Sequence, residues 1–188
     1  IFLCKGHGES QKIVERYPQL LTHKIIDLSQ DYRLSGPHDF VYGLPESNRA
    51  SVKEASHVAN PGCFASAIQL SLLPAIQLSE SIGEIHVSGI TGSTGAGQSF
   101  SETSHFSWRS NNASVYKPLT HQHLKEVGEN LSQYHGKSLD VRFIPYRGAF
   151  ARGIIVTSYF KTGMTDDQLK QAYHSFYEDH PFTQVAEH

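Results

Sequence analysis

One cysteine stands where a protein could use it as a nucleophile. The segment 60–63, Asn-Pro-Gly-Cys, separates a predicted strand that ends at Ala59 from an apolar helix predicted over residues 64–73. The sulfur of Cys63 would lie at the helix N-terminus, where unpaired backbone N–H groups and the helix dipole favour a thiolate, the nucleophilic form. A small buried apolar residue is the alternative for Cys63, and it is our interpretation of Cys4, which lies in an apolar run.

Two histidines at the start of a later predicted helix offer a base for this cysteine. His123 and Glu126 are three residues apart and share one helix face, so the carboxylate could orient the ring of His123. His121 lies about 200° from His123 around a regular helix, so both face one site only if the helix begins after His121. A zinc site on both histidines and Cys63, or a polar helix start without a function, are the alternatives.

A loop of small residues and two arginines offer places for a ligand. Residues 91–97, Thr-Gly-Ser-Thr-Gly-Ala-Gly, follow a predicted strand, and their backbone N–H groups and hydroxyls could bind phosphate or a carboxamide. The loop lacks the lysine of a Walker motif and is no dinucleotide fingerprint, so a plain turn stays open. Arg147 and Arg152 precede a predicted strand, where a guanidinium can bind carboxylate or phosphate. A solvated surface charge is the alternative for both.

The elements that must position these residues follow from hydrophobic periodicity. Ser10 is the predicted N-cap of the first helix, Pro74 is predicted to stop the helix that begins after Cys63, and residues 29–49 are predicted to form a long loop. Alternating strands and helices predict an α/β to α+β layered fold. We predict strands at 24–28, 85–90, 141–144 and 153–160, a glycine-rich loop at 91–98, and helices at 11–17, 64–73, 119–134 and from 165 or 166 to about 178.

Composition excludes several classes of function. The 188 residues include sixteen Lys and Arg and eighteen Asp and Glu, a net charge of −2, which predicts neither a nucleic acid nor an anionic membrane as the partner. No apolar run approaches about 18 residues, so we expect no membrane-spanning helix. Two cysteines do not make a disulfide framework, which favours the cytoplasm. The chain starts in an apolar run without Met, which predicts a piece that begins inside a fold.

In this order, the motifs resemble the family of N-acetyl-gamma-glutamyl-phosphate reductases, relatives of aspartate-semialdehyde dehydrogenase. Residues 58–66 resemble the family's signature around Pro-Gly-Cys, with Ser66 in place of the usual Thr. Residues 145–151 depart from the family's usual short form. Further stretches resemble family motifs: Phe-Leu-Cys-Lys-Gly-His-Gly at 2–8, Asp-Leu-Ser-Gln-Asp-Tyr-Arg at 27–33, Tyr-Gly-Leu-Pro-Glu at 42–46, the loop at 91–97, His-Gln-His at 121–123 and Arg-Gly-Ile at 152–154.

The resemblance implies a partial Rossmann-like segment followed by a mixed-sheet catalytic domain of the semialdehyde dehydrogenase type. Residues 1–62 would be the remnant of the dinucleotide-binding domain, and residues 63–188 the catalytic and substrate domain. The family's Gly-x-Gly-x-x-Gly turn has no counterpart in these residues, and its C-terminal segment is cut short. We therefore expect a fragment of a longer reductase.

The resemblance also implies an activity: NADPH-dependent reduction of N-acetylglutamyl 5-phosphate to the 5-semialdehyde in arginine biosynthesis, by a cytoplasmic homo-oligomer. Cys63 would form a thioester, and His123, oriented by Glu126, would be the base, with His121 as the other candidate. An N-succinyl or aminoadipate analogue, or a cysteine hydrolase or acyltransferase without nicotinamide, stays open. The implied binding residues are Thr91, Gly92, Gly95, Ala96 and His7 for the NADP cofactor and Arg152, Arg147 and Asn60 for the substrate, with no metal.

Overall fold

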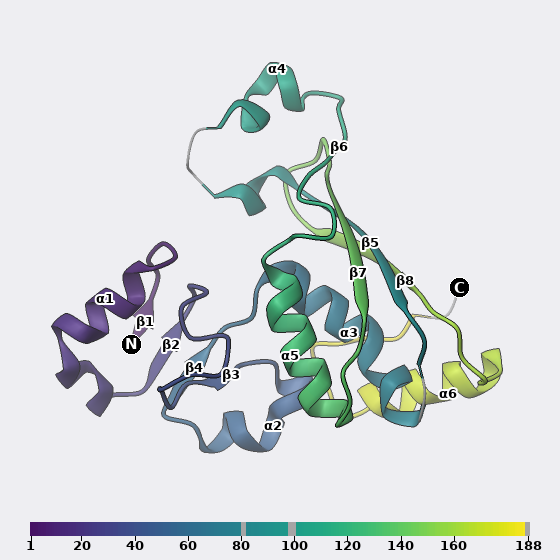
Figure 1. Cartoon of the computed structure of the whole chain (residues 1–188), viewed down its shortest axis with the longest axis horizontal. Coiled ribbons are helices and arrows are strands. Elements are labelled where there is room, and N and C mark those ends of the chain that lie inside the picture. The colour runs from purple at the N-terminus through teal and green to yellow at the C-terminus, as the bar shows by residue number, and fades with distance from the viewer. Residues whose placement is uncertain (80–81, 98–100, 187–188) are drawn as a thin grey trace. The chain divides into compact units, whose positions relative to one another are not determined.

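The protein folds into two compact units, residues 1–62 and 63–188 (Figure 1). The computed structural model describes residues 1–79, 82–97 and 101–186, so Gln98, at the end of the predicted glycine-rich loop, lies outside the described residues. Among the helices in these ranges, none is long and apolar enough to cross a membrane.

The first unit is a parallel sheet of four short strands in the order β1-β2-β4-β3. Its core is an apolar cluster that includes Leu3, Ile25 and Phe40. Because the strands are parallel, the loops that follow β1, β2 and β4 lie at one edge of the sheet, the usual place for ligands in such folds. The elements are β1 (Phe2–Leu3), α1 (Glu9–Arg16), η1 (Pro18–Thr22), β2 (Ile25–Asp27), β3 (Val41–Tyr42), α2 (Pro45–Glu54) and β4 (His57–Ala59).

A distant carboxylate, not Ser10, caps the first helix. The carboxylate of Asp31 accepts the backbone N–H groups of Gly8 at 2.6 Å and of Gln11 at 3.1 Å. Gly8 turns the chain with a φ of 81°, and α1 begins at Glu9, which leaves Ser10 inside the helix. The prediction of a Ser10 cap was wrong because a residue from the loop after β2 supplies the acceptor.

The second unit is a mixed sheet in the order β6-β7-β5-β8, with helices on one face. β5 runs parallel to β7 and antiparallel to β8. Along β5 every second residue, from Ile85 to Thr91, is buried beneath the helices. The elements are α3 (Cys63–Leu78), β5 (Ile85–Thr91), η2 (Ser93–Ala96), η3 (Glu102–Ser104), α4 (Phe106–Arg109), β6 (Ser114–Val115), α5 (His123–His135), β7 (Val141–Arg147), β8 (Ile154–Tyr159) and α6 (Asp166–Tyr177).

Pro74 does not end α3, which continues to Leu78. Proline has no N–H for the carbonyl group four residues earlier, that of Leu70. The hydroxyl of Tyr177 in α6 donates to this Leu70 carbonyl at 2.5 Å, and the hydroxyl of Tyr173 donates to the next one along at 2.5 Å. The prediction that Pro74 stops the helix was wrong because α6 replaces the lost donor.

Other boundaries shift in ways that matter for the site. α5 begins at His123, four residues later than the predicted helix start at 119. The predicted loop over residues 29–49 contains β3 and the start of α2. The last helix begins at Asp166, as predicted, and Thr165 is its N-cap, since Thr165 and Gln168 form a capping box. The predicted fold class, a parallel Rossmann-like segment followed by a mixed sheet, is confirmed.

Candidate active site

Cys63 is held by a helix whose next residues are anchored in the core. It is the first residue of α3 and is exposed, whereas the neighbouring Phe64 is 1% exposed. The ring of Phe64 packs against Phe143 of β7, with ring centroids 4.9 Å apart. The helix start therefore presents the sulfur of Cys63 to solvent. Cys4, predicted to be a small buried residue, is exposed instead, because β1 ends at Leu3.

The N-termini of α3 and α5 lie side by side. The ring of Phe64, at the start of α3, contacts the ring of His121, just before α5, with centroids 5.7 Å apart. Deeper in the pair, the side-chain amide of Asn130 in α5 donates to the amide oxygen of Gln69 in α3. One contact joins the N-terminal ends of the two helices, and the other joins residues further along both of them. The helices therefore run in the same direction. The positive ends of both dipoles therefore face the region around Cys63, which favours an anion there.

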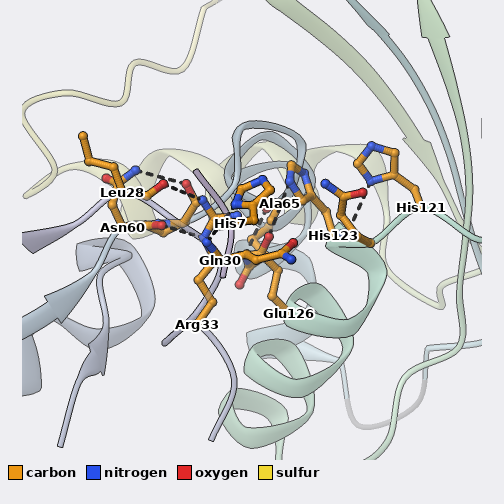
Figure 2. A network of polar contacts seen from close by, with 12 residues as sticks. His7, Leu28, Gln30, Arg33, Asn60, Ala65, His121, His123 and Glu126 are labelled. Carbon is orange, nitrogen blue, oxygen red and sulfur yellow. Dashed lines mark hydrogen bonds and ion pairs between the residues drawn. The ribbon is translucent and has the colours of Figure 1, made fainter. Parts of the chain in front are cut away.

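His121 and His123 lie against each other at the start of α5, with Glu126 one turn further on (Figure 2). Their ring centroids are 4.6 Å apart, and the backbone N–H of His123 donates to Nδ1 of His121 at 3.2 Å. Nε2 of His123 lies 3.8 Å from Oε1 of Glu126, and both side chains are buried. Because α5 begins only at His123, His121 approaches in non-helical chain, so both rings can face one site.

His121 is a neutral histidine. Burial, followed by the charge of Lys117, lowers the pKa of His121 from 6.5 to about 4. Since Nδ1 of His121 accepts the N–H of His123, the ring proton is assigned to Nε2. His121 therefore enters the site as a hydrogen-bond donor.

Two residues that the sequence analysis missed, Tyr116 and Arg109, lie close to this centre. The ring of Tyr116 contacts that of His121, with centroids 5.6 Å apart. The guanidinium carbon of Arg147 lies 4.8 Å from the centroid of the Tyr116 ring. Arg109 donates to the backbone carbonyl of Arg147 at 2.7 Å. No spacing along the chain indicates these contacts, because Arg109 and Tyr116 come from an irregular excursion between β5 and α5.

The glycine-rich loop after β5 is held by residues 150–153, which include the end of the segment that departs from the family's form and part of the Arg-Gly-Ile motif. The backbone N–H groups of residues 92–94 donate to carbonyl groups within residues 150–153, at 2.9 to 3.1 Å. A Cβ atom on Gly92 would lie 2.6 Å from the backbone of Ala151, so the close contact requires glycine. These N–H groups are already bonded within the chain, and they do not form a phosphate cradle.

The loop can still fit a flat ring. Thr91 and Gly92 are buried, and they anchor the loop to the end of β5. Gly95 and Ala96 are exposed, and neither carries a side chain longer than a methyl group. This small surface is suited to close approach by a planar group such as a nicotinamide.

The candidate binding residues of the first unit lie at the carboxyl ends of its strands. His7 is exposed, and its Nδ1 accepts the backbone N–H of Gln30 at 3.1 Å (Figure 2). The carbonyl of Asn60 accepts Nε of Arg33 at 2.8 Å, and Arg33 also donates to the carbonyl of Leu28 at 3.2 Å. The side chain of Asn60 donates to the next carbonyl in its own chain at 3.2 Å. Asn60 is thus fixed at the entrance to the segment that leads to Cys63.

Two predictions from the sequence remain: Arg152 as a substrate-binding residue, and the zinc site as an alternative. Arg152 is exposed in the turn before β8, unlike Arg147, which is half-buried at the end of β7. Within residues 1–79, 82–97 and 101–186, no group of three or more His, Cys, Asp or Glu side chains could hold a metal ion. The zinc alternative has no ligand set in that part of the chain.

Known proteins match both units. Residues 63–188 match the semialdehyde dehydrogenase dimerisation domain, and residues 1–55 match the semialdehyde dehydrogenase NAD binding domain. An N-acetyl-gamma-glutamyl-phosphate reductase of Parabacteroides distasonis is 49% identical over 100% of this chain, and one of Flavobacterium johnsoniae is 48% identical over 99%. The chain spans 59% of the length of each of these relatives.

Solved structures show the same fold at low sequence identity. Aspartate semialdehyde dehydrogenase II of Vibrio cholerae, complexed with ASA, superposes with a TM-score of 0.70 at 14% identity, over 96% of this chain and 60% of that one. The enzyme of Francisella tularensis gives a TM-score of 0.67 at 12% identity, over 93% and 62%. The resemblance seen in the sequence is confirmed by the relatives at 48–49% identity and by the family models, which together match most of the chain. The chain belongs to the semialdehyde dehydrogenase family.

Proposed function

We propose that the protein carrying this chain is an NADPH-dependent acyl-phosphate reductase, which converts N-acetylglutamyl 5-phosphate to N-acetylglutamate 5-semialdehyde. The observation that supports it is an exposed cysteine at a helix start, beside a second helix start that carries two histidines. The relatives at 48–49% identity are named for this reaction. The chemistry would be the same for an N-succinyl or aminoadipate analogue.

The first half of the reaction is carried by Cys63. Its thiolate attacks the acyl carbon, a carbon–sulfur bond forms, and the carbon–oxygen bond to phosphate breaks, so phosphate leaves with the electron pair. The product is a thioester on Cys63. The two helix N-termini beside the sulfur stabilise the anionic species of this step.

In the second half the thioester is reduced and released. When bound, a reduced nicotinamide supplies a hydride to the thioester carbonyl carbon. The carbonyl oxygen takes a proton, and loss of that proton then expels the Cys63 thiolate and frees the aldehyde. A proton donor and acceptor must therefore lie beside this oxygen.

We assign that role to His123. The carboxylate of Glu126, whose Oε1 lies 3.8 Å from Nε2 of His123, can orient this ring while it accepts and returns a proton. His121 is a poor base at neutral pH, because burial and Lys117 lower its pKa to about 4. Its Nε2–H is suited to donating a hydrogen bond to the substrate.

For the cofactor, we propose NADP and two separate surfaces. The exposed Gly95 and Ala96, backed by the buried Thr91 and Gly92, would lie against the nicotinamide. His7, at the end of β1, would contact the cofactor from the NAD binding domain. Two unpaired cysteines are consistent with a protein that is located in the cytoplasm.

We propose that the open face of the second sheet joins two copies of the chain. The helices cover one face only, and apolar side chains remain on the other: Ile155 is 66% exposed and Tyr159 is 57% exposed. Tyr159 and Ile144 also line a hollow of about 300 Å³ on that face. The match of residues 63–188 to a dimerisation domain supports a second copy as its occupant.

The test replaces the sulfur in the full-length protein. Cys63→Ser should lower kcat by several orders of magnitude without loss of folding, because serine is a much poorer nucleophile at neutral pH. Cys4→Ser, at the other exposed cysteine, is the matched control and should retain activity. Reduction is followed by NADPH absorbance with the acyl phosphate as substrate. Acyl transfer or hydrolysis that runs without NADPH would instead indicate a cysteine hydrolase.

A further inference from the structure

Arg109 is a buried cation without a carboxylate partner among the described residues. It is 7% exposed, and burial together with Arg147 lowers the pKa of its guanidinium, which nevertheless stays ionised. All the acceptors of its hydrogen bonds are neutral oxygen atoms. They are the carbonyl groups of Arg147 at 2.7 Å, Thr103 at 3.2 Å and Asn112 at 3.4 Å, and the hydroxyl of Ser114 at 2.9 Å.

Arg147 lies beside it and has a donor to spare. Its Nη1 donates to the hydroxyl of Thr103 at 3.1 Å, and its guanidinium lies over the ring of Tyr116. Its Nε is buried and has no hydrogen-bond partner among the residues that the structure describes. A buried donor on a charged group is costly to leave without an acceptor, and an anion is the acceptor that gains most.

This pair of cations adjoins the catalytic centre through Tyr116. The ring of Tyr116 touches both Arg147 and His121, so it connects the end of β7 to the start of α5. The backbone N–H of Tyr116 donates to the carbonyl of Pro145 at 3.1 Å, which fixes this connection to β7. Burial raises the pKa of Tyr116, Arg147 lowers it and Cys63 raises it, so the phenol lies within electrostatic reach of both.

We infer that Arg147 binds the anionic group of the substrate, with Tyr116 as the wall of this subsite, and that Arg109 is a positioning residue that holds Arg147. The inference rests on the proposed function and deepens it. Sequence alone left Arg147 and Arg152 as equal candidates, and it did not indicate Arg109 or Tyr116. The ligand group is a phosphoryl or a carboxylate oxyanion, since a guanidinium binds both in the same way.

The kinetic test uses the reverse reaction of the full-length protein, in which the aldehyde, inorganic phosphate and NADP are separate substrates. Arg147→Gln should raise one KM by about tenfold to a hundredfold, as expected for a lost charge-assisted contact, while kcat changes much less. A higher KM for phosphate assigns the subsite to the phosphoryl group. A higher KM for the aldehyde assigns it to the substrate carboxylate. Unchanged values for both refute the inference.

The positioning role of Arg109 has its own signature. Arg109→Gln should raise the same KM as Arg147→Gln, by a smaller factor, and Arg109→Lys should restore part of it. A merely structural role would lower stability and kcat without selecting one substrate, and that result would refute the assignment. Arg16→Gln is the matched control, because Arg16 also lies over a tyrosine ring, 5.4 Å from the centroid of Tyr17, but at an exposed helix end.

A binding test separates this inference from the proposed function. Inorganic phosphate or N-acetylglutamate should slow alkylation of Cys63 by iodoacetamide, with Cys63 followed by peptide mass spectrometry. Half-protection should need at least about tenfold more ligand in Arg147→Lys or Arg147→Gln. Protection that is absent, or equal in all variants, overturns the subsite. If the ligand protects Cys63 in the wild type, yet the wild type shows no NADPH-dependent turnover, the proposed function fails while the subsite stands.

Discussion

His121 should remain neutral down to about pH 4, with its proton on Nε2. Two observations lead to this expectation. Nδ1 accepts the backbone N–H of His123, which only an unprotonated nitrogen can do. The side chain is also 6% exposed, and burial with the charge of Lys117 lowers the pKa of His121 to about 4.

The consequence for stability can be worked out from the two pKa values. Above pH 6.5 neither the folded nor the unfolded state holds a second proton on His121, so its contribution is constant. As the pH falls from 6.5 to about 4, only the unfolded state takes up the proton, and the folded state loses stability. At 1.36 kcal/mol per pH unit the loss is at most about 3 kcal/mol, and it is complete below about pH 4.

The assay compares the wild type with His121→Asn, whose amide oxygen can take the place of Nδ1 as acceptor for the N–H of His123 but does not titrate. Denaturant unfolding between pH 4 and pH 7 should show the wild type losing up to about 3 kcal/mol more than the variant. Long-range nitrogen–proton NMR, with the His121 signals assigned by their absence in the variant, should show Nε2 protonated throughout. Parallel pH profiles, a titration near the ordinary value, or a proton on Nδ1 would refute the reasoning.

Three further predictions concern the scaffold of the site. Gly92→Ala should lower stability by about 1–3 kcal/mol and weaken NADP binding in the full-length protein, because its Cβ would lie 2.6 Å from the backbone of Ala151; unchanged unfolding and cofactor titrations would contradict this. Gly128→Ala, in α5 with open space around its Cβ, should instead raise the unfolding free energy by about 0.5–1 kcal/mol. Tyr177→Phe should lower the unfolding free energy by about 1–3 kcal/mol, since the carbonyl of Leu70 loses its donor. Denaturant unfolding of Leu73→Ala, alone and combined with Tyr177→Phe, tests whether the losses of the two substitutions add.

Local signals predicted much of the fold and the centre of the site. The position of Cys63 at a helix start follows from the Pro-Gly turn and the apolar run after it, and α3 begins there. The spacing of His123 and Glu126 on one helix turn places them 3.8 Å apart, as the periodicity of a helix requires. These features depend on neighbours in the chain, so periodicity and turn chemistry were enough to find them.

The features that the sequence did not reveal all depend on distant contacts. Pro74 reads as a helix stop until Tyr177, 103 residues later, supplies the missing hydrogen bond. Asp31 caps α1 from a loop, accepting N–H groups that lie 23 and 20 residues earlier in the chain. Arg109 reads as an ordinary surface charge, and only the packing of the excursion after β5 shows that it is buried. Tertiary partners decide such residues, and one sequence without the fold does not name the partner.

One electrostatic property connects the separate parts of the site. Two helix dipoles point their positive ends toward Cys63, and Arg109 and Arg147 add two charges that no carboxylate among the described residues neutralises. A second proton on His121 would add to this positive field, which is consistent with its neutral state. The same field favours the anions that the proposed reaction brings to the site: a thiolate, an acyl phosphate and the oxyanion that forms between them. Glu126 provides the local exception, and it lies 3.8 Å from His123, the ring that we propose exchanges a proton with the substrate.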